Sequence, residues 1–236
     1  MSLKRQLCLN VGSHLPAWLV GDCLAVAETF EMGRWLRTAG YAPRTHAPNR
    51  DELFEAVGRQ IENRVVLYLE FGVWKGASMQ AWSTLLKNPE SNLHGFDSFV
   101  GLPEDWLPGI QKGHFSTGGR CPALDDPRVR FFKGWFHETL PRYVLPLHDV
   151  LVVNIDSDLY LPARYVLDFL APHFRPGDFV YFDEFHIPHD EVRAFREFVR
   201  NTGLVFSLIG ATQGCSGAVF KCEASPNPAV SGLPSR

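Results

Sequence analysis

The stretch from Val65 to Ser78, VVLYLEFGVWKGAS, constrains the fold of this chain more than any other. It opens with five apolar residues in a row and continues through Glu70, Gly72 and Gly76. An apolar run of this length predicts a strand buried on both faces, as in a parallel sheet. The apolar residues that follow have the spacing of one helix face: Met79, Trp82, Leu85 and Leu86. Strand, glycine turn and helix in this order predict a small-molecule site at the carboxyl edge of an open α/β sheet.

The turn has the pattern E-x-G-x-x-x-G, with a carboxylate at the end of the strand. It matches neither the dinucleotide pattern G-x-G-x-x-G nor the phosphate-binding pattern G-x-x-x-x-G-K-[ST], which disfavours a nicotinamide-dependent oxidoreductase. Unpaired backbone amides from Gly76 to Ser78, at the start of the helix, suit a carboxylate of a ligand. Glu70 repels a pyrophosphate and favours a cationic ligand, such as one with an ammonium and a sulfonium group.

Composition narrows the class of protein. The 236 residues suffice for one sizeable α/β domain with an extension. A net charge of −3 and the absence of a basic run give no footprint for nucleic acid. The five cysteines are scattered and odd in number, which favours reduced thiols in a cytoplasm. No apolar run approaches the about 18 residues that span a membrane. We therefore expect a cytoplasmic protein that binds neither nucleic acid nor a membrane.

The order of expected elements predicts the fold class. Residues 16–38 and 51–63 have helical patterns, and residues 1–63 form a helical extension expected either to cover the site or to pair subunits in a homo-oligomer. Residues 64–222 alternate strands and helices, with strands expected at 65–70, 92–96, 129–133, 150–155, 178–182, 204–209 and 215–221. This predicts an α/β, doubly wound, Rossmann-like sheet of seven strands, with a C-terminal antiparallel hairpin at its edge. Residues 223–236 are expected to be disordered.

Four of these strands end in a carboxylate: Glu70, Asp97, Asp156 and Asp183. Loops after parallel strands gather at the carboxyl edge of the sheet, so these acids are expected to converge on one crevice. Acids also start turns and cap helices, and that ordinary role stays open for each of them alone. Together they gather negative charge that a cation in the site would neutralise.

The order of the strands separates the expected roles. Asp97 follows the second strand, where an α/β sheet usually meets a ribose, and its carboxylate can accept hydrogen bonds from both hydroxyls. Glu70 suits the ammonium group of a ligand. Three further carboxylates suit a hard divalent cation, Mg²⁺ first: Asp156, Asp183 and Glu184. His186 is either a further metal ligand or a hydrogen-bonding loop residue.

Five motifs follow one another along the chain: EFGVWKGAS (70–78), GFDSFVGLP (95–103), KGWFHETLP (133–141), IDSDLY (155–160) and DEF (183–185). Together they resemble the macrocin O-methyltransferase family, class I S-adenosylmethionine enzymes that methylate sugar hydroxyls in macrolide antibiotics. The resemblance covers roughly residues 65–200. It implies a seven-stranded class I methyltransferase fold, S-adenosylmethionine as donor and a divalent cation, usually magnesium, that binds a small-molecule hydroxyl acceptor of secondary metabolism.

The resemblance also implies residue roles. It places the donor-binding loop at Glu70, Gly72, Gly76 and Ser78, and the ribose-side loop at Asp97 and Ser98. It places the metal ligands at Asp156, Asp183 and Glu184. The family usually has Asp-Asp-Tyr where this chain has Asp183-Glu184-Phe185. A glutamate can still bind Mg²⁺, but its side chain is longer, so Glu184 departs from the usual metal ligand at this position. The first 60 residues differ from those of the sugar-modifying members, which leaves the acceptor open.

The expected reaction is an in-line attack of the acceptor oxygen on the sulfonium methyl group. Coordination to a divalent cation lowers the pKa of the acceptor hydroxyl and fixes its direction, and a base takes its proton. Asp158 is favoured as the base over His137 and His186, with helix capping as its ordinary alternative. Trp135 and Phe136 either flank the adenine of the donor or belong to the core, and residues 98–128 are long enough for a lid.

Two rival functions stay open at this point. The first is a metal-dependent methyltransferase of a catechol or phenolic acceptor, whose two vicinal oxygens chelate the cation. The second is a non-catalytic protein that binds S-adenosylmethionine, against which the intact acids at 156, 183 and 184 argue. These functions share one fold, so only the site residues distinguish them.

Overall fold

The computed structural model describes residues 3–41 and 45–224, in two compact units, Met1–Ala42 and Pro43–Arg236. The first unit contains helices α1 (Leu3–Gly12) and α2 (Ala17–Thr38), and Trp35 packs edge-on against Tyr41 with ring centroids 5.4 Å apart. In the described ranges, no helix combines the length and the apolar character that crossing a membrane requires.

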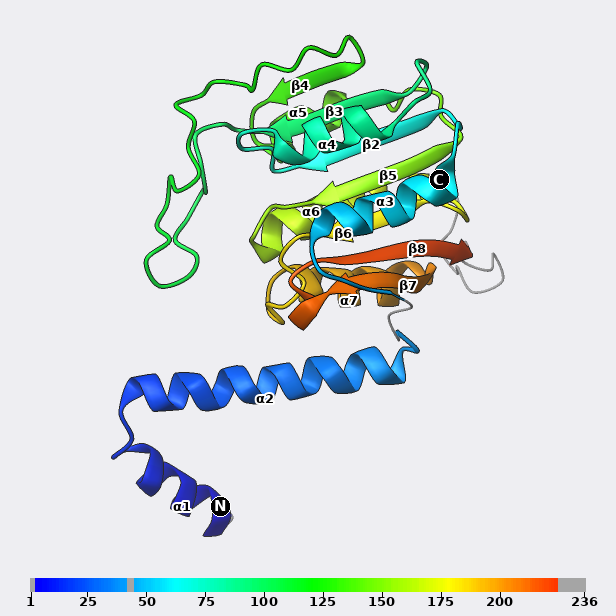
Figure 1. The fold of residues 1–236 in the computed structure, drawn as a ribbon. Helices are drawn as coiled ribbons and strands as arrows, with labels where there is room; N and C mark the ends of the chain where they lie inside the picture. Colours follow the sequence, from blue (N-terminus) through cyan, green and yellow to red (C-terminus); the bar gives the residue numbers. More distant parts are fainter. Residues whose placement is uncertain (1–2, 42–44, 225–236) are drawn as a thin grey trace, which may run out of the picture. The chain divides into compact units, whose positions relative to one another are not determined.

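The second unit is built on one eight-stranded sheet with the strand order β1-β7-β8-β6-β5-β2-β3-β4 (Figure 1). All neighbouring strands are parallel except β8, which is antiparallel to both β6 and β7. The strands are β1 (Thr45–Ala47), β2 (Val66–Phe71), β3 (Asn92–Asp97), β4 (Val129–Lys133), β5 (Val150–Ile155), β6 (Phe179–Phe182), β7 (Val205–Thr212) and β8 (Ala218–Ala224).

Helices cover both faces of this sheet. One face carries α3 (Arg50–Ile61) and α4 (Ala77–Leu85), and the other carries α5 (Phe136–Thr139), α6 (Tyr160–Leu170) and α7 (Glu191–Thr202) (Figure 1). Three short 3₁₀ helices complete the unit: η1 (Leu140–Arg142), η2 (Ala171–His173) and η3 (Gln213–Cys215). This is the doubly wound α/β arrangement that the alternating pattern predicts.

The central strand β2 is buried along its whole length, as its continuous apolar run predicts. Its register places Glu70 beside Gly95 of β3 and Asn154 of β5. On the α4 face, the ring of Tyr68 stacks on Trp82 with centroids 4.9 Å apart. Because β2 is buried and paired on both sides, the position of Glu70 and of the glycine turn that follows is set by the neighbouring strands.

The structure differs from the predicted layout in three places. The strand β1 is an eighth strand that pairs with β7, so the C-terminal hairpin is not the outermost pair of the sheet. Helix α3 belongs to the sheet-containing unit, so the units divide after residue 42 and not after residue 63. The tail predicted at 223–236 lies outside the described residues except for Glu223 and Ala224, which end β8. A strand of three residues gives too weak a pattern to place from sequence, and the helical pattern at 51–63 does not reveal which unit the helix packs in.

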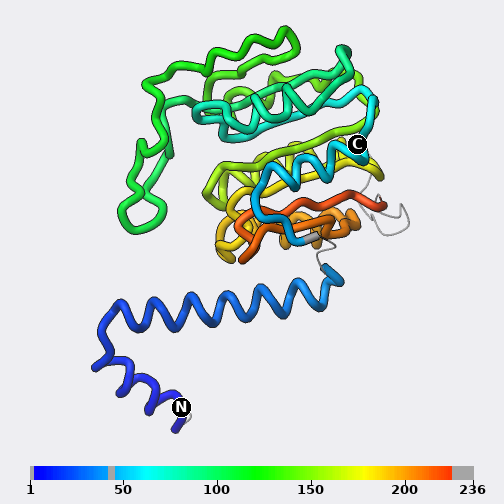
Figure 2. Tube along the Cα trace, in the orientation of Figure 1, coloured from blue at the N-terminus to red at the C-terminus, as the bar shows by residue number. Residues whose placement is uncertain are grey.

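The carboxyl ends of β2, β3, β5 and β6 meet at one edge of the sheet, because these four strands are parallel neighbours. The segment 98–128, which joins β3 to β4, extends from the same edge as a long loop (Figure 2). The indole N–H of Trp106 in this loop donates a hydrogen bond to Asp190 Oδ2 at 2.9 Å, just before α7. The loop is thereby attached to an element of the opposite half of the sheet.

Candidate active site

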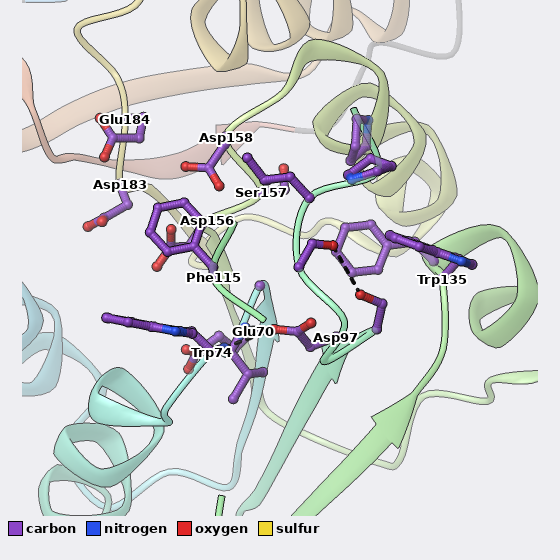
Figure 3. Close-up of a pocket in the computed structure, with 18 of the residues that line it drawn as sticks. Glu70, Trp74, Asp97, Phe115, Trp135, Asp156, Ser157, Asp158, Asp183 and Glu184 are labelled. Carbon is purple, nitrogen blue, oxygen red and sulfur yellow. Dashed lines mark hydrogen bonds between the residues drawn. The ribbon is translucent and has the colours of Figure 1, made fainter. Parts of the chain in front are cut away.

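A pocket of about 910 Å³ lies at this edge of the sheet (Figure 3). Its lining includes ten of the residues predicted for the site: Glu70, Gly72, Ser78, Asp97, Ser98, Trp135, Asp156, Asp158, Asp183 and Glu184. Gly76 is not among the lining residues, although it begins helix α4 as its N-cap with φ of 80°. We call residues 70–78 together with Asp97 the glycine-loop end, and the four acids at 156, 158, 183 and 184 the acid end.

Gly72 is the point where the two ends touch. Its φ is +94°, and a Cβ atom on it would lie 1.7 Å from the backbone oxygen of Asp156. Its N–H donates a hydrogen bond to the Phe96 carbonyl at 3.0 Å. Only glycine combines this backbone conformation with such a close approach, so the glycine loop is pressed directly against the start of the acid end.

Asp97 holds the loops on both sides of it. Its Oδ2 accepts hydrogen bonds from the N–H groups of Val73 at 2.9 Å and Trp74 at 2.8 Å, and its Oδ1 accepts one from Phe99 at 2.6 Å. A carboxylate offers about four acceptor positions, so three are filled and about one remains for a ligand. The sequence predicts contacts to both hydroxyls of a ribose and misses this anchoring of the glycine loop.

Glu70 lies at the floor of the pocket and is only 1% exposed. Its Oε2 accepts a hydrogen bond from the Tyr68 hydroxyl at 2.7 Å, and that hydroxyl accepts one from Asn154 Nδ2 at 3.1 Å. Burial raises the pKa of Glu70 to about 8, against the partial opposition of the Tyr68 hydrogen bond. A cation bound here would restore the charged form of this carboxyl group.

The acid end concentrates negative charge. Burial, and then the charges of Glu184 and Asp183, raise the pKa of Asp158 to about 7. Burial and Asp183 raise the pKa of Glu184 to about 7. The pKa of Asp156 is also raised, by burial and then by Asp183 and Asp158. The side chains of Asp156 and Asp158 receive no hydrogen bond from any described residue in the structure. These carboxyl groups therefore lack the partners that normally stabilise buried negative charge.

Asp183 is the acid with the most partners at this end. Its Oδ1 accepts a hydrogen bond from the Tyr181 hydroxyl at 2.7 Å, and Arg50 Nη1 lies 3.8 Å from its Oδ2. Arg50 is the first residue of α3 and lines the pocket, but nothing in the sequence pattern singles it out. Its guanidinium group supplies part of the positive charge that the acids require.

The metal prediction concerns three of these carboxyl groups, Asp156, Asp183 and Glu184. Across residues 3–41 and 45–224, no three Asp, Glu, His or Cys side chains are grouped closely enough to hold an ion. The chemistry of the set nevertheless fits a hard cation, because the three predicted ligands are carboxylates of one pocket. The raised pKa values of Asp156 and Glu184 also indicate unneutralised charge at this place.

Aromatic side chains form two walls of the pocket (Figure 3). Trp135 and Phe136 line one side of the pocket. Phe136 also packs edge-on against the buried Phe71, with ring centroids 5.5 Å apart, so it belongs to the pocket wall and to the core. Trp74 and Phe115 form an edge-on pair with centroids 5.6 Å apart, and both have positive φ, of 49° and 64°. Such bulky residues in this conformation mark locally strained backbone at the site.

Of the two histidines considered as bases, His137 lines the pocket and His186 does not. His186 Nδ1 lies 3.3 Å from Glu184 Oε2. The sequence gives no signal for Ser157, whose buried hydroxyl lines the pocket without a hydrogen-bond partner in the described part of the chain. This hydroxyl is thus available for a hydrogen bond to water or to a bound ligand.

The model of the family described as macrocin O-methyltransferase (TylF) matches residues 49–212 of this chain. The mycinamicin III 3''-O-methyltransferase of Micromonospora griseorubida is 33% identical over 132 residues, which are 53% of this chain and 49% of that protein. An O-methyltransferase of Streptomyces olivaceus, which acts on the 4' position of a rhamnosyl tetracenomycin C, is 29% identical over 54% of this chain and 57% of its own. The chain thus spans about half the length of these relatives.

Solved structures show the same fold. The O-methyltransferase NovP superposes with a TM-score of 0.59 at 23% identity, over 74% of this chain and 79% of its own. The calicheamicin methyltransferase CalS11 superposes with a TM-score of 0.60 at 22% identity, over 83% of this chain and 91% of its own. At this level of identity the likeness concerns the fold, which is that of class I methyltransferases.

Proposed function

This chain belongs to the macrocin O-methyltransferase family, and on that premise we propose that it transfers a methyl group from S-adenosylmethionine to a hydroxyl group of a small molecule. One observation carries the proposal: a single pocket joins a glycine loop with a buried acid at its floor to a cluster of unneutralised carboxyl groups. The first part suits a cationic donor, and the second suits a hydroxyl that must lose a proton. S-adenosylmethionine supplies the electrophilic methyl group on its sulfonium sulfur.

At the glycine-loop end, Glu70 binds the ammonium group of the donor, and its raised pKa falls when that charge arrives. The amides at the start of α4, near Ser78, face the donor carboxylate. Asp97 uses its remaining acceptor position on a ribose hydroxyl and keeps the glycine loop in place through Val73 and Trp74. Trp135 flanks the adenine. These residues bind and orient the donor without taking part in the bond exchange.

At the acid end, Asp158 accepts the proton of the acceptor hydroxyl as the oxygen attacks the methyl carbon. A pKa of about 7, raised by burial and by Glu184, suits a base at neutral pH because proton transfer and the correct charge state then coincide. The attacking oxygen forms its bond to the methyl carbon while the carbon–sulfur bond breaks and its electron pair returns to sulfur. The proton stays on the Asp158 carboxyl group until solvent removes it.

A divalent cation is part of the proposal. Asp156, Asp183 and Glu184 are the residues that would hold it, because they are oxygen donors on adjacent loops. Such an ion, Mg²⁺ first, would supply the positive charge that lowers the pKa of an acceptor hydroxyl. Arg50, beside Asp183, contributes charge of the same sign from the chain itself.

The acceptor we propose is a sugar hydroxyl of a natural product. The relatives support it, since the names of two of them specify a mycinamicin and a rhamnosyl tetracenomycin as substrates. The pocket volume of about 910 Å³ is near the upper end of ligand pockets and leaves space beside a nucleoside donor.

Calorimetric titration with S-adenosylmethionine and S-adenosylhomocysteine, each with and without Mg²⁺, tests the donor site. We expect both to bind, and absence of binding under both conditions would remove the methyltransferase proposal. Assays with mycinamicin III, the rhamnosyl tetracenomycin C named for the Streptomyces relative, and catechol then separate a sugar acceptor from a phenolic one. Binding of the donor without Mg²⁺-stimulated turnover on any acceptor would instead support a protein that only binds S-adenosylmethionine.

A further inference from the structure

Glu191 is the first residue of helix α7 and is completely buried, with 0% of its surface exposed. Acids are common in the first turn of a helix, where they complement its dipole from the solvent-exposed surface. Glu191 departs from that arrangement because it is buried and because its hydrogen-bond partners lie outside its own helix. Its presence therefore needs another reason.

The carboxylate of Glu191 joins two loops of the acid end. Its Oε1 accepts a hydrogen bond from the N–H of Ser157 at 3.1 Å, and its Oε2 accepts one from the N–H of Glu184 at 3.3 Å. Ser157 stands between Asp156 and Asp158 after β5, and Glu184 follows Asp183 after β6. One side chain thus binds the backbone of both loops that carry the four acids.

The helix that carries Glu191 is a rigid support. Val192, Ala194, Phe195 and Phe198 are all 0% exposed, and the Phe195 ring packs against Phe182 with centroids 5.1 Å apart. Groups that position a site are most effective when their own packing fixes them. Glu191 is therefore held at one fixed distance from both loops.

A carboxylate is well suited to this double contact, because both of its oxygens accept hydrogen bonds. A glutamine has one acceptor oxygen and one NH₂ group, which is a donor. It therefore accepts a hydrogen bond from only one of the two backbone N–H groups, and its NH₂ group faces the other N–H without forming a bond. An aspartate is one methylene shorter, so its carboxylate reaches less far from the helix. Burial of a carboxylate among other acids is costly, and it persists here with two backbone donors as its compensation.

We propose that Glu191 is a positioning residue of the acid end, which fixes the loops after β5 and β6 so that their four acids face one acceptor oxygen. The inference rests on the proposed function, since it names the residue that sets the geometry of that same site. Glu191 does not line the pocket, so it acts through Ser157 and Glu184 and touches neither donor nor acceptor.

The test compares wild type with Glu191→Gln and Glu191→Asp. In both variants, hydrogen exchange measured by NMR should accelerate at the amide of Ser157, Glu184 or both, while the amides of Val73 and Trp74 keep their exchange rates. With the most rapidly methylated acceptor of the panel above, kcat should fall about 10- to 100-fold, as is usual when a group supporting a site is removed. The dissociation constant for S-adenosylmethionine should change less than about threefold, because the glycine loop is untouched.

Glu197→Gln is the matched control, because it makes the same change in the same helix. Glu197 accepts hydrogen bonds from Tyr160 and Arg164 outside the pocket, so this variant should lower stability while kcat stays within about twofold. Unchanged exchange at Ser157 and Glu184, or unchanged kcat in both Glu191 variants, would overturn the proposal. Failure of both Glu191 variants to fold would also overturn it, since Glu191 would then be a residue of the fold.

The exchange experiment is independent of the proposed function. If wild-type protein binds no S-adenosylmethionine, the methyltransferase proposal fails, and the amide exchange still reports whether Glu191 holds the two loops. If wild type binds and methylates while both Glu191 variants retain full kcat, only the positioning role fails. The two failures are thereby distinguishable.

Discussion

The two ends of the pocket solve the problem of buried polar groups in opposite ways. At the glycine-loop end, the Asp97 carboxylate accepts three backbone hydrogen bonds and the Glu70 carboxyl group accepts one from Tyr68. At the acid end, Asp156 and Asp158 accept none from the described residues and repel each other. The chain thus fills most acceptor positions of Asp97 with its own amides, and the described residues donate no hydrogen bond to the side chains of Asp156 and Asp158.

This difference agrees with the roles that we propose for the two ends. A site whose polar groups are already oriented binds its ligand with little rearrangement, which suits a donor of constant structure. A cluster of uncompensated acids takes up positive charge or a proton, which suits the place where a hydroxyl group is deprotonated. The two ends meet where Gly72 lies against the Asp156 carbonyl, so each can be perturbed separately or both at once.

The largest expected effect separates the two ends most sharply. Asp156→Asn removes a carboxylate from the acid end, and we expect kcat to fall roughly a thousandfold, since stabilisation by a bound cation is worth several kcal/mol. Donor affinity, measured by calorimetry, should stay within about threefold. Full activity of Asp156→Asn would show that the acid end does not work through this residue.

Gly72→Ala should disturb the structure of both ends of the pocket, because Gly72 lies where they meet. The new Cβ meets the Asp156 carbonyl at 1.7 Å and the backbone is at φ +94°, so we expect a loss of about 3 kcal/mol in the free energy of unfolding, together with weaker donor binding. Urea denaturation measures the first effect and calorimetry the second. Gly109→Ala is the matched control, because Gly109 has φ +88° with nothing within 4 Å, and it should cost only about 1 kcal/mol.

The pH dependence of stability should reveal the raised pKa values of both ends. The folded protein holds a proton on Glu70 up to about pH 8, whereas the unfolded chain releases it near the ordinary value of 4.5. Between these values the folded state binds more protons, so the free energy of unfolding should fall as pH rises, by about 3 kcal/mol from pH 5.5 to 8 for Glu70 alone. Asp158 and Glu184, each with a pKa raised to about 7, act in the same direction.

Glu70→Gln measures how much of the pH dependence of the free energy of unfolding comes from Glu70, at the glycine-loop end. Glutamine still accepts the Tyr68 hydrogen bond but does not titrate, so the loss of stability between pH 5.5 and 8 should be smaller than in wild type. Glu55→Gln, an exposed acid paired with Arg59, should leave the pH dependence unchanged. A wild-type protein that gains stability from pH 5.5 to 8 would contradict the raised pKa values.

The smallest effect concerns the hydrogen bonds of Asp97. In Asp97→Asn, the side chain keeps one acceptor oxygen for three backbone amides, so the glycine loop loosens and the dissociation constant for S-adenosylmethionine should rise about tenfold. Asp149→Asn is the control, since Asp149 accepts one hydrogen bond from the Val65 amide outside the pocket and should leave donor affinity unchanged. Equal affinities in both variants would mean that Asp97 does not organise the donor site.

Much of the glycine-loop end is predictable from local sequence. Residues 65–78 form strand, turn and helix in one continuous stretch, and each step depends on neighbours within a few positions. The acids that end parallel strands were expected at one edge, and Glu70, Asp97, Asp156 and Asp183 do line one pocket. This shared location follows from the parallel direction of the strands, because parallel strands have their carboxyl ends at the same edge of the sheet. The donor, metal and catalytic roles assigned to these residues stay predictions.

Other contributions are invisible in the sequence because they depend on distant segments. Arg50 lies just before the helix predicted at 51–63, and nothing in the local sequence indicates that it starts α3 or that its side chain approaches Asp183. Glu191 has the local signature of an ordinary helix-terminal acid, and only the tertiary structure brings its two oxygens to Ser157 and Glu184. Strand β1 has only three residues, too few to show a strand pattern in the sequence. These residues are a strand because they pair with β7.

The sequence by itself determined the fold class, the succession of the central strands along the chain and the set of acids at their ends, because these depend on residue patterns within short segments. Only the tertiary structure decided which of these acids receive hydrogen bonds and which remain uncompensated. That difference arises from burial and from amides contributed by segments tens of residues away, as between Asp97 and Val73 or Glu191 and Ser157. Desolvation and hydrogen bonding depend on what surrounds a group in space, and a linear pattern does not contain that information.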